Sequence, residues 1–134
     1  MNKLQKIVSG KLDETYIIAE IGINHNGSLS NALELIYKAV ETGVDAVKFQ
    51  KRNLANIYSS HILNDSNSAE WNFEYLIPLL QELELSESDY HTINDTCKTL
   101  GIDLIITPMD ESSAEFISTL DIVGFKIASA DMTN

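Results

Sequence analysis

Four short, nearly continuous apolar runs restrict the fold of this chain more than any other feature. They are rich in Ile, Val, Phe and Ala, and such runs are typical of strands that are buried on both faces. Burial on both faces is the mark of parallel strands covered by helices. The sequence therefore predicts four parallel strands, at Tyr16–Asn24, Asp45–Arg52, Asp103–Met109 and Val123–Ser129.

Helical patterns separate the predicted strands. Apolar residues recur at spacings of three and four over Ser28–Gly43, Ser86–Gly101 and the shorter Ser113–Leu120. Ser28 and Ser86 are the expected N-caps of the first two helices, which are expected to end at Gly43 and Gly101. Strands that alternate with helices fold as right-handed βαβ units around a parallel sheet, so we expect an α/β fold. Asn53–Leu85 is predicted to be the irregular connection, although its last part, Phe73–Leu85, is expected to be helical at least in part. Lys3–Lys11 is predicted to be a short hairpin or a frayed terminus.

The charge of the chain narrows its possible partners. The 134 residues include 9 Lys and Arg against 20 Asp and Glu, which gives a net charge of −11. Because nucleic acid binding needs a basic surface, no nucleic acid partner is expected. No apolar run approaches the roughly 20 residues that span a bilayer, and the N-terminus shows no secretory pattern. We therefore expect no membrane partner and a cytoplasmic location.

Polar side chains interrupt the apolar strands, mostly toward their C-terminal ends, where parallel α/β folds bind ligands. Side chains alternate between the two faces of a strand. Glu20, Gly22 and Asn24 are therefore expected to share one face of the first strand. Lys48 and Gln50 are expected to share one face of the second.

Two lysines within these strands, Lys48 and Lys126, each need a negative partner, because an unpaired buried ammonium costs several kcal/mol. Glu20 could pair with one of them in a purely structural ion pair. The alternative is a bound phosphate or carboxylate. Two lysines close to the hydroxyls of Thr107 and Ser129 suit a phosphate better than a carboxylate.

The turn Asn24–Gly27, with the sequence NHNG, follows the first predicted strand and precedes a helix. Three polar groups and a glycine at such a turn predict a loop that contacts a ligand, with Asn24 and His25 as candidate binding residues. No pair of His, Cys or carboxylate residues has a convincing metal-ligand spacing, so no metal ligand is predicted in the chain.

Four segments, in order, resemble motifs of the N-acetylneuraminate (sialic acid) synthase family: IIAEIGINHNG, DAVKFQ, ITPMDESSAEFI and FKIASADMTN. The resemblance runs from about Tyr16 to Asn134. It implies a TIM (β/α)₈ barrel followed by a small antifreeze-like domain. Residues 1–134 would then be the N-terminal half of the barrel, with the first four strands, and without the rest of the barrel and the C-terminal domain.

The family resemblance also implies a reaction, the condensation of phosphoenolpyruvate with N-acetylmannosamine or a related 2-acetamido sugar. The product is a sialic-acid-type nonulosonic acid, and phosphate is released. A divalent metal, expected to be manganese and bound outside this chain, polarises the aldehyde. The full-length protein is expected to be a homodimer.

Site roles follow from the same resemblance, residue by residue. Glu20 and Gln50 are the predicted catalytic residues, with Glu20 near the sugar carbonyl as a proton donor or orienter. Phosphoenolpyruvate would be held by Lys48, Thr107, Lys126 and Ser129.

Two alternatives remain open at this point. The 134 residues could be a catalytically incomplete half-barrel, inactive by themselves, whose first and fourth strands have open edges that invite pairing. The chain could also belong to an aldolase that forms a Schiff base through Lys126 or Lys48.

Overall fold

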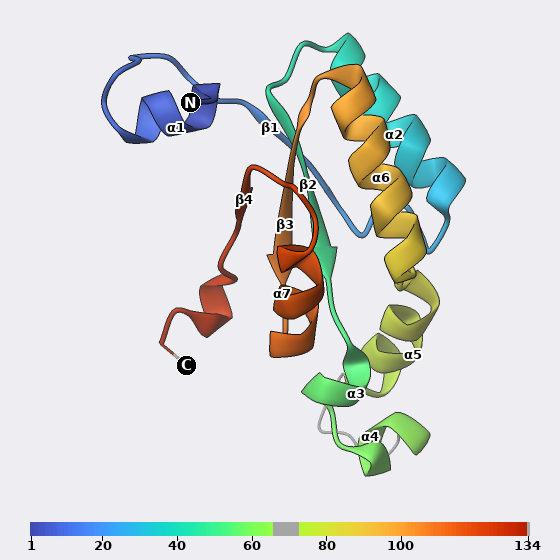
Figure 1. Cartoon of the computed structure of the whole chain (residues 1–134). Coiled ribbons are helices and arrows are strands. Elements are labelled where there is room, and N and C mark those ends of the chain that lie inside the picture. Colours follow the sequence, from blue (N-terminus) through green and yellow to red (C-terminus); the bar gives the residue numbers. More distant parts are fainter. Residues whose placement is uncertain (66–72, 134) are drawn as a thin grey trace.

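A parallel four-stranded sheet forms the centre of the molecule (Figure 1). The computed structural model describes residues 1–65 and 73–133. The strands lie in the order β1-β2-β3-β4, and helices connect them along the chain. Their bounds are β1 Ile18–Gly22, β2 Ala46–Lys51, β3 Asp103–Pro108 and β4 Gly124–Phe125. The predicted parallel α/β architecture is confirmed.

The first strand ends earlier than predicted, at Gly22 instead of Asn24. Gly22 has a positive φ of 57°, which an extended strand cannot continue. A turn follows, in which the Asn24 N–H donates to the Ile21 carbonyl at 3.0 Å. The turn that contains the NHNG segment therefore begins inside the range that was predicted to be strand.

The fourth strand is also shorter than the predicted Val123–Ser129. Its ladder with β3 covers Gly124–Phe125, and one further bond joins the Lys126 N–H to the Ile106 carbonyl at 3.1 Å. The chain then enters a 3₁₀ turn, η2 (Ser129–Asp131). Among the described residues β4 is hydrogen-bonded on one side only, so fewer backbone bonds hold its end extended.

Three helices pack on the sheet, α2 (Leu29–Glu41), α6 (Glu87–Leu100) and α7 (Glu111–Ser118). The caps predicted for the first two are present, since the hydroxyls of Ser28 and Ser86 each accept a backbone N–H. Gly101 ends α6 with a left-handed φ of 70°. α7 begins before the predicted Ser113, because Asp110 is its N-cap.

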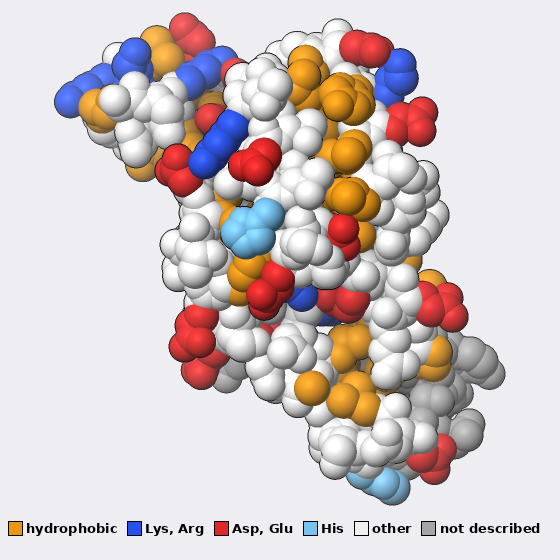
Figure 2. All heavy atoms as spheres, turned by 45° about the vertical axis from the view of Figure 1, so that its right-hand side comes forward, with side chains coloured by type: hydrophobic (Ala, Val, Ile, Leu, Met, Phe, Trp, Pro, Cys, Tyr) orange, Lys and Arg blue, Asp and Glu red, His pale blue; other side chains and the backbone are white. Residues whose placement is uncertain are grey.

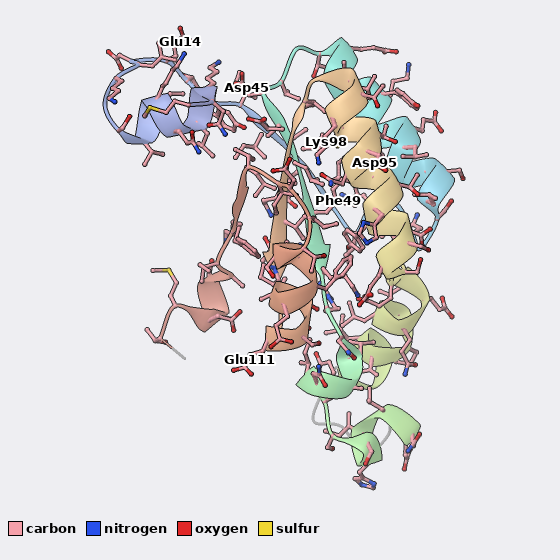
Figure 3. The ribbon with its side chains drawn as sticks, viewed as in Figure 1. Glu14, Asp45, Phe49, Asp95, Lys98 and Glu111 are labelled. Carbon is pink, nitrogen blue, oxygen red and sulfur yellow. The ribbon has the colours of Figure 1, made fainter. Side chains whose placement is uncertain are left out.

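The apolar core lies between the sheet and these helices. Val47 and Phe49 of β2 and Ile106 of β3 point into it, each with 0% of its surface exposed. Figure 3 shows Phe49 between β2 and α6. Lys48 and Gln50 alternate with these residues along β2 and therefore point to the opposite face. The sheet thus has one face in the core and one that carries polar side chains.

The N-terminal segment is a helix, α1 (Lys3–Val8), so the hairpin and the frayed terminus were both wrong expectations. Asn2 caps it, and the ammonium of Lys3 bonds to Asp45 at 2.8 Å, just before β2 (Figure 3). This bond holds the pKa of the Asp45 carboxyl below its ordinary value. The contact joins residues far apart in the sequence, which a local pattern cannot reveal.

The connection between β2 and α6 contains three helices, of which the last confirms the helix expected within Phe73–Leu85, while the first two lie where an irregular loop was expected. They are α3 (Leu54–Ile57), α4 (Ser60–Asn64) and α5 (Phe73–Leu83). Residues 66–72 of this predicted loop lie outside the described residues. In the described part of the chain, no helix combines the length and the apolar character that crossing a membrane requires.

Replacing Phe49 by Ala is expected to lower the free energy of unfolding by about 3–5 kcal/mol, because it empties a fully buried aromatic site. The matched control is Tyr37→Ala on α2, where the side chain is 48% exposed and a loss below about 1 kcal/mol is expected. Chemical denaturation measures both. Equal losses in the two variants would show that Phe49 is not part of the core.

Candidate functional site

Lys48 of β2 is the centre of a polar cluster on the face of the sheet away from the core. Its register partner on β1 is Glu20, and the Lys48 Nζ lies 2.5 Å from Glu20 Oε2. The same ammonium donates to Thr107 Oγ1 of β3 at 3.4 Å. The Lys48 side chain is 14% exposed and that of Glu20 is 51% exposed. The negative partner of Lys48 in the structure is therefore the Glu20 carboxylate, one of the two kinds of partner that the sequence predicted.

A bulge in β1 follows Glu20. Glu20 pairs with Lys48 and Gly22 pairs with Phe49, so Ile21 is an extra residue on β1. Glu20 and Gly22 nevertheless face the same side, as predicted, because a Cβ built on Gly22 would lie 3.2 Å from Glu20 Oε1. Asn24 lies beyond the strand, in the turn, where its side chain bonds to the Ile21 carbonyl.

Gly22 keeps the space between two predicted catalytic side chains open. A Cβ built on Gly22 would lie 3.2 Å from Glu20 Oε1 and 3.5 Å from Gln50 Nε2. The first of these distances is tighter than an ordinary van der Waals contact. A side chain at this position would be strained by the positive φ and would press against the end of Glu20. Sequence reasoning missed this role, although the glycine stands inside the first recognised motif.

Gln50 is held through both its backbone and its side chain. The buried Tyr90 hydroxyl of α6 donates to the Gln50 carbonyl at 2.5 Å, and burial raises the pKa of Tyr90, so the hydroxyl stays a donor. The Gln50 Oε1 accepts from Arg52 Nη2 at 2.6 Å. Gln50 and Thr107 are register partners, which places the amide beside the Lys48 cluster.

Two cations at the end of β2 converge on one carboxylate, that of Glu84. Lys51 Nζ lies 3.2 Å from Glu84 Oε2, and Arg52 Nε lies 3.6 Å from Glu84 Oε1. Burial raises the pKa of Glu84 above its ordinary value, although both cations oppose that shift. These residues also line a cavity of about 490 Å³ with residues of α3 and α7.

The side chains of Lys126 and Ser129 form no hydrogen bond or ion pair with the Lys48 cluster within the described part of the chain. Lys126 follows directly after β4, and its side chain is exposed and forms no hydrogen bond or ion pair with the described residues. If the β3–β4 register continued, Lys126 would face the same side as Thr107. Ser129 is exposed at the start of η2. Polar contacts therefore join Glu20, Lys48 and Thr107, whereas the Lys126 side chain makes none with them.

Asn24 and His25 occupy the turn after β1. The Asn24 side-chain amide donates to the Ile21 carbonyl at 2.9 Å, so this amide stabilises its own turn. His25 is 1% exposed, its Nδ1 accepts from the Gly27 N–H, and its ring stacks on Phe49 with centroids 6.0 Å apart. Burial lowers its pKa. Because Phe49 belongs to the core face, His25 is not brought to the Lys48 side.

Asp110 joins the ends of β2 and β3, a role that sequence reasoning missed. Its carboxylate accepts from the backbone N–H groups of Asn53 and Ser113 at 2.6 and 2.9 Å. It also accepts from the hydroxyls of Ser112 and Ser113 at 2.7 and 2.6 Å. Burial opposes its ionisation, but these bonds outweigh burial and hold the pKa of Asp110 at about 2. The sequence of Asp110–Ser113 is typical of a helix N-cap. The bond between Asp110 and the distant Asn53 has no signal in the sequence.

The arrangement can bind an anion through local charge. Figure 2 shows basic side chains gathered on α1 and acidic ones scattered over the rest of that face. Lys48 supplies one cation, Thr107 a hydroxyl and Gln50 an amide donor on the same side of the sheet, next to the carboxylate of Glu20. Among residues 1–65 and 73–133, no group of three or more His, Cys, Asp or Glu is placed to hold a metal ion.

Comparison with known proteins decides the family. The model described as "NeuB family" matches residues 35–134, well over half of the chain. The chain belongs to the NeuB family. It is 38% identical over 123 residues to the N,N'-diacetyllegionaminic acid synthase of Legionella pneumophila. It is also 38% identical over 134 residues to the N-acetylneuraminate-9-phosphate synthase of Drosophila melanogaster.

These relatives are much longer than the chain. The matches cover 89% of this chain but 34% of the Legionella protein, and 98% of this chain but 36% of the Drosophila protein. The chain therefore spans about a third of the curated NeuB-type relatives that it matches.

Solved structures agree with the fold. The N-acetylneuraminic acid synthetase of Leptospira borgpetersenii matches with a TM-score of 0.71 and 25% identity, over 89% of this chain and 38% of that one. The spore coat polysaccharide biosynthesis protein SpsE of Bacillus subtilis matches with a TM-score of 0.62 and 34% identity, over 85% and 29%. The expected TIM-barrel type of α/β fold and the family resemblance are both confirmed.

Replacing Asp110 by Asn is expected to reduce the loss of unfolding free energy that the protein shows as the pH falls from 4 to 2. The folded-state pKa of about 2 lies below the ordinary 3.8, so Asp110 contributes stability above about pH 4 that is lost as the pH falls to 2. The variant should lose stability at neutral pH and show a smaller decrease between pH 4 and 2, measured by denaturation across pH. Asp121→Asn, with a side chain that is 92% exposed, is the control. An unchanged acid slope in Asp110→Asn would contradict the assignment.

Proposed function

We propose that the complete protein condenses phosphoenolpyruvate with a 2-acetamido sugar and releases phosphate, forming a nonulosonic acid. The observation that carries this proposal is the shielded Lys48 ammonium beside Glu20 and Thr107. Membership of the NeuB family supports it, since relatives carry the names of sialic, legionaminic and pseudaminic acid synthases. N-acetylmannosamine is the proposed sugar or the parent of a related one.

The proposed chemistry forms one carbon–carbon bond and breaks one carbon–oxygen bond. The methylene carbon of phosphoenolpyruvate attacks the open-chain aldehyde, whose oxygen takes up a proton. Water adds to the resulting oxocarbenium carbon, and phosphate leaves with cleavage of its bond to that carbon. The new keto oxygen comes from the water, so no oxidant or reductant is needed.

Lys48 would bind the phosphate or carboxylate of phosphoenolpyruvate. A charge-assisted bond from an ammonium to such an oxygen is stronger than a neutral one, and shielding from water strengthens it further. Thr107, 2% exposed, would add a hydroxyl bond to the same ligand. Lys126, whose backbone N–H bonds to Ile106 directly before Thr107, and Ser129 are proposed to complete this site.

Glu20 and Gln50 would contact the aldehyde half of the reaction. The Glu20 side chain is half-exposed, and the gap at Gly22 lies between its Oε1 and the Gln50 amide. An aldehyde oxygen in this gap could accept a bond from the Gln50 N–H and lie near the Glu20 carboxyl, which would orient or protonate it. Asn24 is proposed to contact the sugar from the rim of the turn.

The divalent metal, with manganese as the expected ion, would supply Lewis-acid polarisation of the aldehyde. The described residues of this chain do not form a site for it, so its ligands are proposed to lie outside this chain. The homodimer expected for the full-length protein is likewise a proposal.

Replacing Lys48 by Met in the complete protein should lower phosphate release from phosphoenolpyruvate by roughly a hundredfold or more, because a charged contact to the substrate is lost. The assay contains manganese and N-acetylmannosamine or a related 2-acetamido sugar. Lys38→Met is the matched control, since Lys38 is 64% exposed on α2 and pairs with Glu41. No release by the unaltered protein with any such sugar would contradict the proposed function.

Replacing Gly22 by Ala should reduce kcat/KM for the sugar by roughly tenfold or more, because the new Cβ enters the gap beside Glu20 and Gln50. Gly101→Ala separates this effect from backbone strain. Gly101 has a similar positive φ of 70°, but nothing lies within 4 Å of a Cβ built there. Equal kinetic losses in the two variants would mean that the gap at Gly22 has no role in substrate binding.

A further inference from the structure

The orientation of the Gln50 amide is fixed by a residue that the sequence did not single out, Arg52. A guanidinium carries only donors, so the group that it contacts on Gln50 must be the oxygen. The Arg52 Nη2 lies 2.6 Å from Gln50 Oε1. The amide nitrogen therefore points away from Arg52, and it is the Nε2 atom that lies nearest to the gap at Gly22.

Arg52 is itself held firmly. Its side chain is 10% exposed, and its Nε lies 3.6 Å from the Glu84 carboxylate, which also pairs with Lys51. The backbone of Gln50 needs no further support from Arg52. Tyr90 and the ladder of β2 with β3 already fix it. The bond from Arg52 thus acts on the direction of the amide rather than on the position of the strand.

We propose that Arg52 is a positioning residue that directs the amide N–H groups of Gln50 into the gap beside Glu20, where they donate to the carbonyl oxygen of the second substrate. This role rests on the proposed condensation. With the amide in this direction, the gap has a donor on one side and a carboxylate on the other.

The opposite amide orientation would place two oxygen atoms, those of Gln50 and Glu20, around the gap. An aldehyde oxygen would then find no donor from Gln50, and this hydrogen bond to the substrate would be lost. The geometry therefore selects a ligand with a hydrogen-bond acceptor at this point, such as the aldehyde of an open-chain sugar. Phosphoenolpyruvate, bound through Lys48 and Thr107, would not depend on Arg52.

The kinetic test replaces Arg52 by Met in the complete protein. We expect the KM for the sugar to rise about tenfold while the KM for phosphoenolpyruvate stays within about twofold, and Arg52→Lys to restore part of the sugar affinity. Lys51→Met is the matched control, because Lys51 shares the Glu84 partner but does not contact the Gln50 amide. Equal effects of Arg52→Met and Lys51→Met, or equal changes in both KM values, would overturn the positioning role.

A second measurement does not depend on activity. Gln50→Glu keeps an acceptor for Arg52 but brings a second carboxylate close to Glu20, so it should lower the midpoint of thermal unfolding only slightly. In the Arg52→Met background the same substitution should lower the midpoint by clearly more, because no guanidinium then neutralises the new carboxylate. Additive effects would overturn the contact and the positioning role together. If the effects are coupled but the unaltered protein releases no phosphate, the proposed function fails, and the role of Arg52 in that reaction fails with it.

Discussion

Shielding an ammonium group inside a parallel sheet is the constraint on which the rest of this structure depends. Lys48 lies on β2, between β1 and β3, and only 14% of its side chain is exposed. An ammonium so placed needs an anion and further acceptors nearby. Glu20 and Thr107 supply them from the two flanking strands. The parallel register makes this possible, because it brings residues of three separate segments to one level of the sheet.

From this pair, polar contacts extend along the C-terminal end of β2. Gln50 bonds to Arg52, Arg52 faces Glu84, and Glu84 also receives Lys51. Asp110 then ties the start of α7 to the backbone of Asn53 after β2. Each side chain in the series is held by a neighbour, and such support keeps binding groups in one geometry before a ligand arrives.

The sequence predicted well wherever local chemistry decides structure. The apolar runs located four strands, and the caps Ser28, Ser86 and Gly101 located the ends of two helices, because each acts on backbone within one turn. The predicted end of the first strand was wrong, because the positive φ of Gly22 ends the strand two residues early. Prediction also failed at α1, whose attachment depends on a bond from Lys3 to the distant Asp45.

The same difference between local signals and contacts between distant segments applies to the candidate site. The types of residue were readable: a lysine and a glutamate within apolar strands need each other or a ligand, and family motifs gave Gln50 and Thr107 their expected roles. Geometry was not readable. His25 turned toward the core against Phe49, and Lys126 stayed exposed after a short β4. Both outcomes depend on neighbours that come from other segments.

By itself, then, the sequence determined the class of fold, the order of its elements and the chemical groups available at the strand ends. Only the tertiary structure decided which of these groups meet. The parallel register between β1 and β2 aims Glu20 at Lys48, and Arg52 turns the Gln50 amide toward Gly22. The physical reason is the distance along the chain over which each kind of interaction acts. Apolar periodicity and capping act within a few residues, whereas ion pairs and amide orientation depend on atoms that only folding brings within about 3 Å.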